Sequence, residues 1–434
     1  MQESAVATPD DVIAAIAARE VALTSARRWG VVLLCALICL LDGYDMVVAP
    51  ISVPVLAESW GLEASAFAAA LTATVLGMAL GAAFLAPLGD RFGRRPVILA
   101  SFFFVGLASL LTPLSATVLE LAVFRLVTGL GMGASLANAL ALASEFALQR
   151  LRSRIITCVY SMSAVGSVLG GFLAPPLLAA YGWQGLYAVG GLLPLALLPL
   201  LWMWLPESIR FQVLRSQGAP GSRSETTASS KNLLASIHLL LARPYRARTL
   251  LLWSLYLLCT FTVYVISSWL PTLMRLHGWS IENSVHAIMV FSFGGIVGGF
   301  LLGWLVDRGR ITTCLLASFV CTAVAMVALN VVPASIWIWM SLIGVMGGGM
   351  IGVSYAMAAL AAIVYPTDLR ASGIGTASAM GRVGATLAPA VGGWLLALGW
   401  TVTSIFTGLI VPMIAGVLIV MVFARAFAVK DPLV

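Results

Sequence analysis

The stretch WGVVLLCALICLLDGYDMVVAPISVPV, residues 29–55, decides the fold of this chain. It is long and apolar enough to cross a lipid bilayer as a helix, which takes about 20 apolar residues. Two carboxylates, Asp42 and Asp45, interrupt it three positions apart and therefore share one face of that helix. A carboxylate at membrane depth costs at least ~2.5 kcal/mol, and two neighbouring carboxylates also repel each other. We therefore expect the pair to face a partner or a water-filled cavity and to handle protons.

Apolar segments of the same kind recur along the whole chain. Of the 434 residues, 61% are hydrophobic and 9% are charged, and the mean hydropathy is +1.03. This balance excludes a water-soluble domain, whose surface must be covered with polar groups. We predict an all-α integral membrane protein with twelve transmembrane helices at residues 29–55, 66–88, 96–114, 118–144, 155–179, 183–205, 248–274, 284–306, 311–331, 335–364, 371–396 and 400–424.

The basic residues indicate the orientation of these spans. The formal net charge is +7, but Lys and Arg are spread over short loops on alternate sides of the spans, which excludes a nucleic-acid-binding patch. With the N-terminus inside, Arg275 falls outside, Arg125 and Arg382 fall within spans, and every other Lys and Arg falls on the inner side. This is the positive-inside pattern. We expect a multi-pass protein of a bacterial-type inner (plasma) membrane with both termini cytoplasmic.

The chain also divides into two similar halves. A Gly-, Ser- and Thr-rich stretch separates six spans from six, and Asp90 after span two corresponds to Asp307 after span eight. Duplicated halves with a site between them are typical of transporters. We predict a cytoplasmic tail, a six-helix bundle, a cytoplasmic linker, a second six-helix bundle and a cytoplasmic tail, at residues 1–28, 29–205, 206–247, 248–424 and 425–434.

The loop Asp90-Arg91-Phe92-Gly93-Arg94-Arg95 resembles the signature of the major facilitator superfamily. The Asp-Gly-Tyr-Asp of span one resembles the aromatic acid:proton symporter family within it, as do residues 268–272 (SWLPT) and 381–384 (GRVG). Two departures are Ala86, where the loop motif usually has Gly, and a second copy that is one residue short at Gly309. The resemblance implies two pseudo-symmetric six-helix bundles that close around a central cavity by alternating access.

Charged residues inside the membrane are the first candidate site. Asp42 and Asp45 are the predicted proton-coupling residues. Arg125 lies at a similar depth, and it either pairs with one aspartate or binds the carboxylate of the substrate; the alternative is a purely structural ion pair. Arg382 lies near the membrane midplane without an acid on its own helix. Because a guanidinium binds a carboxylate through two hydrogen bonds, we predict that Arg382 binds the substrate.

Two further groups complete the candidate site. Aromatic side chains that would stack on a substrate ring, or alternatively only pack, are Tyr44, Tyr264, Trp269 and Tyr355. Charges at the inner boundary either anchor the chain or, as the resemblance implies, form a cytoplasmic gate; they are Asp90, Arg91, Arg94 and Arg95 with Glu145 as partner, and Asp307, Arg308 and Arg310 as a weaker counterpart.

We therefore expect a proton-coupled symporter that imports a small organic acid as a monomer in the lipid bilayer, with an aromatic carboxylate as the favoured substrate. A sugar or an aliphatic carboxylate is the alternative substrate, and a transporter-like receptor that does not transport is the alternative from another class. An enzyme is disfavoured because the chain has no HExxH motif and only three scattered histidines. No cofactor and no metal are expected, since no CxxC spacing occurs.

Overall fold

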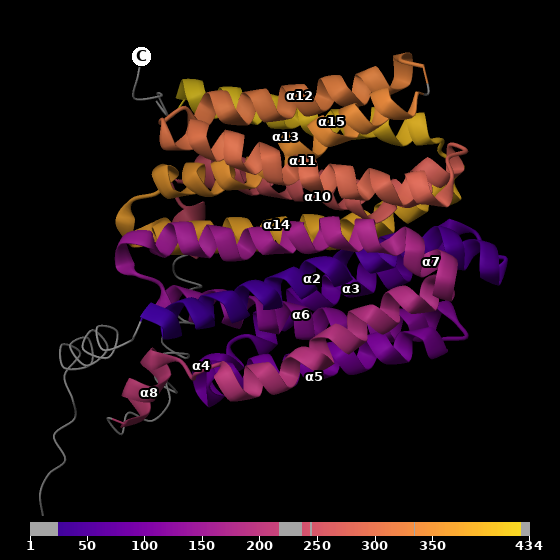
Figure 1. Ribbon diagram of the computed structural model, residues 1–434. Helices are drawn as coiled ribbons and strands as arrows, with labels where there is room; N and C mark the ends of the chain where they lie inside the picture. Colours follow the sequence, from indigo (N-terminus) through magenta and orange to yellow (C-terminus); the bar gives the residue numbers. More distant parts are fainter. Residues whose placement is uncertain (1–24, 217–236, 244, 334, 427–434) are drawn as a thin grey trace, which may run out of the picture. The chain divides into compact units, whose positions relative to one another are not determined.

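The structure is a computed structural model that describes residues 25–216, 237–243, 245–333 and 335–426. The described part of the chain is almost entirely helical, as the apolar composition predicts. The long helices and their bounds are α2 (Ser25–Trp60), α3 (Ala68–Leu80), α5 (Arg94–Leu111), α6 (Val118–Phe146), α7 (Arg152–Trp204), α10 (Arg246–Leu276), α11 (Ile281–Asp307), α12 (Ile311–Val331), α13 (Ile336–Val364), α14 (Thr367–Ala397) and α15 (Val402–Ala426) (Figure 1).

Short helical turns connect these helices. A π-helical turn continues α3, and α8 is a short helix after α7. Their bounds, with those of α4 and the 3-10 turns, are η1 (Ala64–Phe67), η2 (Gly81–Leu85), α4 (Leu88–Phe92), η3 (Thr112–Leu114), η4 (Gln149–Leu151) and α8 (Ile209–Ser216).

The helices follow the predicted spans closely and confirm the predicted fold class. Among the described residues, ten helical segments are long and apolar enough to cross a bilayer. One of them, in α7, contains the two predicted spans 155–179 and 183–205. Gly182 lies between these spans with φ 64° and ψ −165°, a conformation that only glycine adopts at low cost. α14 (Thr367–Ala397) contains the predicted span 371–396. Each of the twelve predicted spans therefore corresponds to a helix.

The chain forms two compact units. Unit 1 contains the described residues within Met1–Asp45, Ala73–Gly166 and Gln184–Ser230, and unit 2 contains those within Met46–Thr72, Ser167–Trp183 and Lys231–Val434. α2, α3 and α7 therefore contribute to both units. The predicted bundles 29–205 and 248–424 differ from the units in residues 46–72 and 167–183, and the division into six and six spans stays a prediction.

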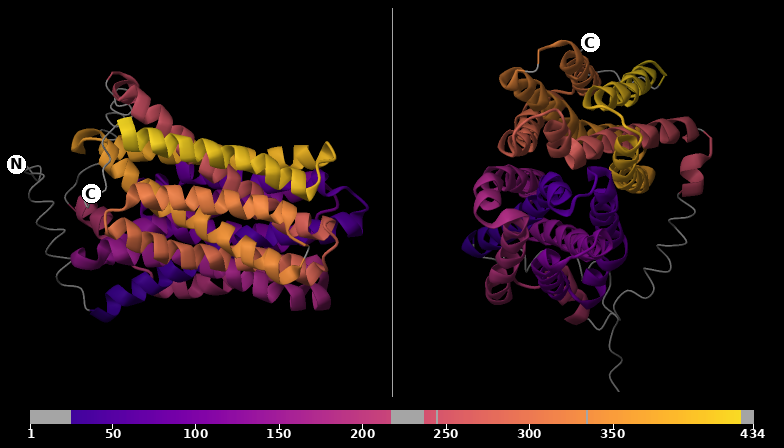
Figure 2. Two further views of the ribbon diagram at one scale, coloured as in Figure 1. Left: turned by 90° about the horizontal axis from the view of Figure 1, so that it is seen from above. Right: turned by 90° about the vertical axis from the view of Figure 1, so that its right-hand side faces the viewer.

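In unit 1, helix pairs approach closely because glycines line their contacts. α5 packs against α6 (Figure 2). α6 also packs against η2. A Cβ atom on Gly129 of α6 would lie 2.2 Å from the Thr74 carbonyl oxygen, and one on Gly133 would lie 2.1 Å from the Met78 carbonyl oxygen. The glycine-rich sequence of span four is therefore required by backbone contact. Cys35 and Cys39 are buried in the apolar core of this unit.

Unit 2 is built in the same way. α11 packs against α13, α10 packs against α14, and α12 packs against α13 and α15. Gly298 of α11 meets Gly348 of α13 so closely that an added Cβ atom would lie 2.2 Å from the Gly348 carbonyl oxygen. At one end of this unit, Arg275 of α10 forms an exposed ion pair of 2.8 Å with Glu58 of α2. The glycine contact explains why small residues are frequent in these spans.

Candidate functional site

Asp45 and Arg125 form a buried ion pair in unit 1. Arg125 Nη1 lies 3.2 Å from Asp45 Oδ1 and 3.1 Å from Oδ2. The arginine is fully buried, and 2% of the aspartate side chain is exposed. The helices α2 and α6 supply one residue each, so the pair joins two segments that are 80 positions apart in the sequence. The sequence is compatible with two partners for Arg125, and the structure shows the pairing with an aspartate.

Three hydroxyl groups complete the surroundings of Arg125. Its Nη2 donates hydrogen bonds to the side-chain oxygens of Ser109 (3.1 Å), Thr112 (3.2 Å) and Thr128 (3.0 Å). Ser109 in turn donates to Asp45 Oδ1 over 3.2 Å. The guanidinium also lies over the ring of Tyr187, with 4.8 Å between Cζ and the ring centroid. We call these residues the Arg125 cluster: Asp45, Ser109, Thr112, Arg125, Thr128 and Tyr187.

Asp42 lies one helical turn before Asp45 but has different surroundings. Its side chain is buried, with 6% of the residue exposed. Within the described part of the chain, its Oδ1 has no hydrogen-bond partner and its carboxylate has no ion-pair partner. A buried acceptor without a donor is costly, and a buried carboxylate without a counter-ion more so. The two predicted coupling residues are therefore unequal: Asp45 has Arg125 as its counter-ion, and Asp42 has no counter-ion among the described residues.

Arg382 lies within α14 of unit 2, and its side chain is exposed. Among the residues that the structure describes, no carboxylate is within ion-pair distance of it. The neighbouring backbone is held firmly, because Thr260 of α10 donates a 2.7 Å hydrogen bond to the carbonyl of Gly381. Binding of the substrate carboxylate by Arg382 stays a prediction.

The predicted aromatic ligands lie in different surroundings. Tyr44 is buried in unit 1, and its hydroxyl donates a 3.1 Å hydrogen bond to the carbonyl of Leu186. Trp269 is buried in unit 2, where its Nε1 donates to the Pro389 carbonyl over 3.0 Å and its ring lies against Gly392. Tyr264 is half-buried in α10, and the side chain of Tyr355 lies outside the described residues. Tyr44 and Trp269 each have a packing role, and stacking on a substrate stays a prediction for all four.

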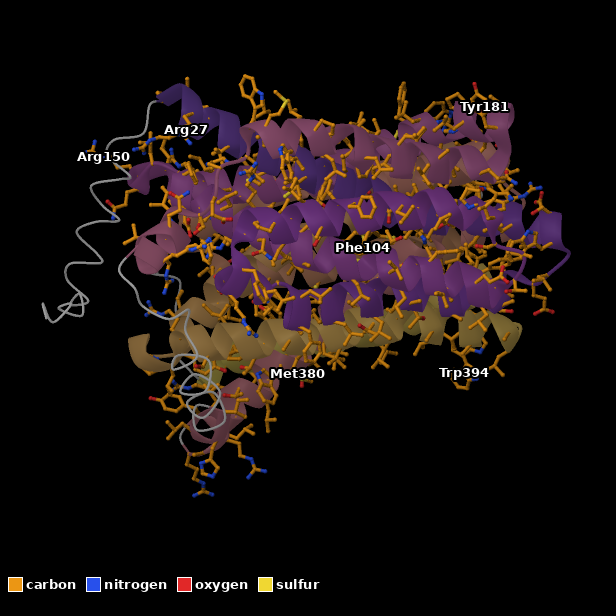
Figure 3. All side chains as sticks on the ribbon, turned by 90° about the horizontal axis from the view of Figure 1, so that it is seen from below. Arg27, Phe104, Arg150, Tyr181, Met380 and Trp394 are labelled. Atoms are coloured by element: carbon orange, nitrogen blue, oxygen red, sulfur yellow. The ribbon has the colours of Figure 1, made fainter. Side chains whose placement is uncertain are left out.

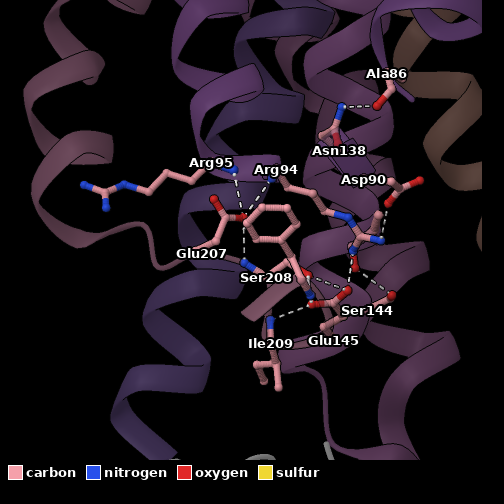
Figure 4. A network of polar contacts seen from close by, with 12 residues as sticks. Ala86, Asp90, Arg94, Arg95, Asn138, Ser144, Glu145, Glu207, Ser208 and Ile209 are labelled. Atoms are coloured by element: carbon pink, nitrogen blue, oxygen red, sulfur yellow. Dashed lines mark hydrogen bonds and ion pairs between the residues drawn. The ribbon is translucent and has the colours of Figure 1, made fainter. Parts of the chain in front are cut away.

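Of the predicted gate residues of unit 1, Asp90, Arg94 and Glu145 are joined in one network (Figure 4). Arg94 Nη1 lies 2.5 Å from Glu145 Oε1, and its Nη2 lies 3.4 Å from Asp90 Oδ1. Asp90 is largely exposed, whereas Arg94 and Glu145 are mostly buried. The start of α5 and the end of α6 are thus joined, as predicted for Glu145. Arg91 lies over the ring of Phe92, and Arg95 donates to the carbonyl of Trp202.

Glu207 and Ser208 extend this network to α8. Glu207 Oε1 accepts hydrogen bonds from the backbone N–H groups of Arg94 (2.7 Å), Arg95 (3.3 Å) and Ser208 (2.8 Å). Glu145 accepts from the Ser208 hydroxyl at 2.8 Å and from the Ile209 N–H at 3.0 Å. We call Asp90, Arg94, Glu145, Glu207 and Ser208 the gate network. The helices α5 and α8 therefore begin on carboxylates, which favour helix N-termini.

Two separate constraints require glycine at position 93 of this loop. Its φ angle is 103°, and a Cβ atom there would lie 2.4 Å from a carboxylate oxygen of Glu207. Gly89 is constrained by Asn138, whose side-chain oxygen would lie 1.9 Å from an added Cβ atom. Asn138 donates a 3.2 Å hydrogen bond to the carbonyl of Ala86. The two glycines of the loop motif therefore permit close contact with polar side chains.

The second copy of the loop motif is less connected. Asp307, Arg308 and Arg310 are exposed in unit 2. Arg308 lies over the ring of Trp304, with 3.7 Å between Cζ and the ring centroid. The described residues show no ion pair for these three side chains. Their role as a weaker counterpart of the gate stays a prediction.

The sequence profile of the Major Facilitator Superfamily matches this chain in two overlapping stretches, residues 33–372 and 286–432. The chain belongs to the Major Facilitator Superfamily. It is accordingly a multi-pass membrane transporter and not an enzyme. Solved structures of this superfamily share the fold: the xylose transporter XylE from E. coli, in a partially occluded inward-open conformation, has a TM-score of 0.69 at 16% identity over 92% of this chain and 98% of its own.

Relatives within the superfamily extend over nearly the full chain. The 4-hydroxybenzoate transporter PcaK of Pseudomonas aeruginosa is 34% identical over 89% of this chain and 90% of its own. The gallate transporter of Pseudomonas putida is 35% identical over 93% of each chain. The 3-(3-hydroxy-phenyl)propionate transporter of Escherichia coli is 32% identical over 87% of this chain and 89% of its own. The predicted resemblance to aromatic-acid transporters of the Major Facilitator Superfamily is confirmed.

Several members of the Arg125 cluster and of the gate network were not predicted from the sequence. Ser109, Thr112 and Thr128 bind Arg125, but hydroxyl residues are common in membrane helices and carry little signal. The contact between Thr128 and Arg125 could have been predicted, because Thr128 lies three positions after Arg125 on the same helix face. Glu207 was not predicted, because its contact with the start of α5 spans more than 110 positions.

Proposed function

We propose that this member of the Major Facilitator Superfamily imports a small aromatic carboxylate together with a proton by alternating access. The observation that carries the proposal is the difference between the two buried aspartates: Asp45 has Arg125 as counter-ion, and Asp42 Oδ1 has no described partner. A carboxylate that must stay buried without a counter-ion is the natural site of an exchangeable proton. Asp42 is therefore the proposed proton carrier.

Asp45 has a separate role in this proposal. The Arg125 cluster holds Asp45 as a carboxylate through an ion pair and a hydrogen bond from Ser109. A fixed negative charge one helical turn from Asp42 makes proton binding at Asp42 sensitive to the surroundings. A conformational change that alters solvent access to Asp42 would then load the proton on one side of the membrane and release it on the other.

Arg382 is the proposed ligand of the substrate carboxylate. It is exposed and has no described carboxylate partner. Arg125 is less suited to this role, because Asp45 and three hydroxyl groups already occupy Nη1 and Nη2. An aromatic acid as substrate is supported by the relatives that are named for 4-hydroxybenzoate, gallate and 3-(3-hydroxy-phenyl)propionate.

The gate network is proposed to fasten one end of unit 1 and to rearrange during the transport cycle. Its ion pairs and charge-assisted hydrogen bonds join the starts of α5 and α8 to the end of α6. We assign this end to the cytoplasmic side, where the basic loops place it. Both termini would then be cytoplasmic, and the membrane would be a bacterial inner membrane.

Uptake into membrane vesicles tests the proposal. Vesicles that contain the protein are given labelled 4-hydroxybenzoate, gallate, 3-(3-hydroxyphenyl)propionate, xylose and succinate, with and without an imposed pH gradient. We expect accumulation of at least one aromatic acid above its external concentration only when the gradient is present. Accumulation of xylose or succinate alone would overturn the substrate class. Uptake that is the same with and without the pH gradient would overturn the proton coupling.

A further inference from the structure

A cavity of about 220 Å³ lies at one end of unit 1, and no member of the Arg125 cluster lines it. The start of α2, the end of α6 and the start of α7 form its walls. Five of its lining side chains are largely apolar, and two carry polar or charged groups. The lining residues are Ser25, Arg28, Trp29, Val32, Phe146, Leu148 and Ile155. The cavity is therefore amphipathic, with its polar groups at the start of α2.

The chain around this cavity is strongly basic. Residues 25–32 and 146–155 together contain five arginines and no acid: Arg27, Arg28, Arg150, Arg152 and Arg154. Figure 3 shows Arg27 and Arg150 at the same end of the structure. Glu145, the nearest acid in sequence, is already paired with Arg94. α7 begins at Arg152 without a side-chain cap, so its first N–H groups add to the positive potential.

We propose that this cavity binds an anionic phospholipid. The arginines attract a phosphate, and the apolar lining accepts the first part of an acyl chain beside Trp29, Val32 and Ile155. A small soluble anion would not use the apolar lining, and a zwitterionic lipid would not use the net positive charge. Basic clefts between transmembrane helices at the cytoplasmic side are a recurring site for acidic lipid headgroups, and the positive-inside pattern assigns this end to that side.

Lipid titration followed by native mass spectrometry tests the proposal. The full-length protein in a mild detergent is titrated with dioleoylphosphatidylglycerol and, separately, with dioleoylphosphatidylcholine. We expect tighter binding of the anionic lipid, and we expect Arg28→Gln to weaken that binding about fivefold, the effect of one basic residue near an anionic surface. Arg246→Gln is the matched control, because Arg246 is an exposed arginine at the start of α10 and does not line the cavity.

The control variant Arg246→Gln distinguishes a specific lipid site from general attraction of anionic lipid to basic residues. Equal weakening by Arg28→Gln and Arg246→Gln, or equal binding of the two lipids, would overturn the proposal. Displacement of the bound lipid by millimolar inorganic phosphate would indicate a free-anion site and would overturn it too. A second variant, Val32→Phe, keeps every charge but fills apolar space, and we expect it to weaken lipid binding as well.

Photolabelling locates the lipid. A phosphatidylglycerol with a diazirine in its acyl chain should label peptides that contain residues 25–32 and 146–155 after illumination. The absence of label from both peptides would overturn the proposal, as would labelling that persists unchanged in Val32→Phe. These experiments measure lipid binding without transport, so their outcome is independent of the proposed substrate and of proton coupling.

Discussion

Arg125 Nη1 lies 3.2 Å from Asp45 Oδ1 and 3.1 Å from Oδ2, and the arginine side chain is fully buried. Bringing two charges into such a site is expensive, and their attraction offsets the cost only while both are present. The pair therefore fixes α2 and α6 together and also sets the charge beside Asp42. These two consequences can be separated by mutation.

Asp45→Asn should destabilise the protein strongly. It leaves Arg125 buried without its counter-ion, and removal of one partner of a buried pair typically costs about 3–5 kcal/mol. Thermal unfolding of the detergent-purified protein measures the effect. The double variant Asp45→Asn with Arg125→Gln removes both charges and should recover part of the stability. Equal stability of Asp45→Asn and the wild type would contradict a structural role for the pair.

Asp42→Asn should behave differently. No described partner of Asp42 Oδ1 is lost, so the free energy of unfolding should change by less than about 1 kcal/mol. Accumulation driven by a pH gradient should be abolished, because the amide cannot release a proton. Exchange of substrate down its own gradient should persist, since a neutral side chain mimics the protonated acid. Uphill uptake and substrate counterflow are measured side by side, and full accumulation in Asp42→Asn would remove Asp42 from the coupling mechanism.

The sequence predicted the charged residues of this site but not which of them form the ion pair. Two acids and one arginine within apolar spans at similar depth were enough to predict that Arg125 either pairs with an aspartate or binds the substrate, because isolated charges are too costly in a membrane. The sequence did not indicate which aspartate takes the arginine. That choice depends on the rotation of α6 relative to α2 and on the hydroxyl groups of α5 and η3, which spacing along one helix does not determine.

Arg382→Lys should weaken substrate binding. A lysine keeps the charge but loses the planar pair of donors that fits a carboxylate. The KM for uptake should rise about tenfold, the effect of one lost hydrogen bond to a charged group. Arg370→Lys is the matched control, because Arg370 is an exposed arginine near the start of the same helix. An unchanged KM in both Arg382→Lys and Arg382→Ala would exclude this arginine as the carboxylate ligand.

Asp90→Asn should impair turnover with little effect on stability. The Asp90 side chain is 76% exposed and lies 3.4 Å from Arg94, a geometry that contributes about 0–1 kcal/mol at most. Glu207→Gln is the informative contrast, since Glu207 accepts three backbone N–H groups and should be more important for stability. Initial uptake rates and thermal unfolding are compared for both variants. Wild-type turnover in Asp90→Asn would reduce Asp90 to a membrane anchor.

The gate network shows a second limit of sequence analysis. Asp90, Arg94 and Glu145 were predicted from a charged loop at a membrane boundary, and the structure brings them together. The larger share of the hydrogen bonds is made by Glu207 and Ser208, which follow α7 and lie near α5 only in the folded chain. Carboxylates that accept from backbone N–H groups leave no pattern of paired charges in the sequence, so they were not identified as gate residues.

Ser109→Ala should uncouple transport more than it destabilises the fold. Ser109 is the hydroxyl that contacts both members of the ion pair: it donates to Asp45 Oδ1 and accepts from Arg125 Nη2. Its removal leaves Arg125 with Thr112 and Thr128, so the arginine stays bound and the structure should persist. Asp45 loses its hydroxyl donor, and we expect the maximal rate of pH-driven uptake to fall roughly fivefold, the effect of about one hydrogen bond.

Ser135→Ala provides the matched control for this prediction. Ser135 is equally buried on α6, but its hydroxyl donates only to the Met132 carbonyl of its own helix. Both alanine variants lose one buried hydroxyl, and only Ser109→Ala touches the Arg125 cluster. The pH profile of uptake should therefore change in Ser109→Ala and stay that of the wild type in Ser135→Ala, while Ser109→Thr should restore it. Identical pH profiles in the two alanine variants would show that Ser109 only fills space, because loss of packing alone does not alter how uptake responds to protons.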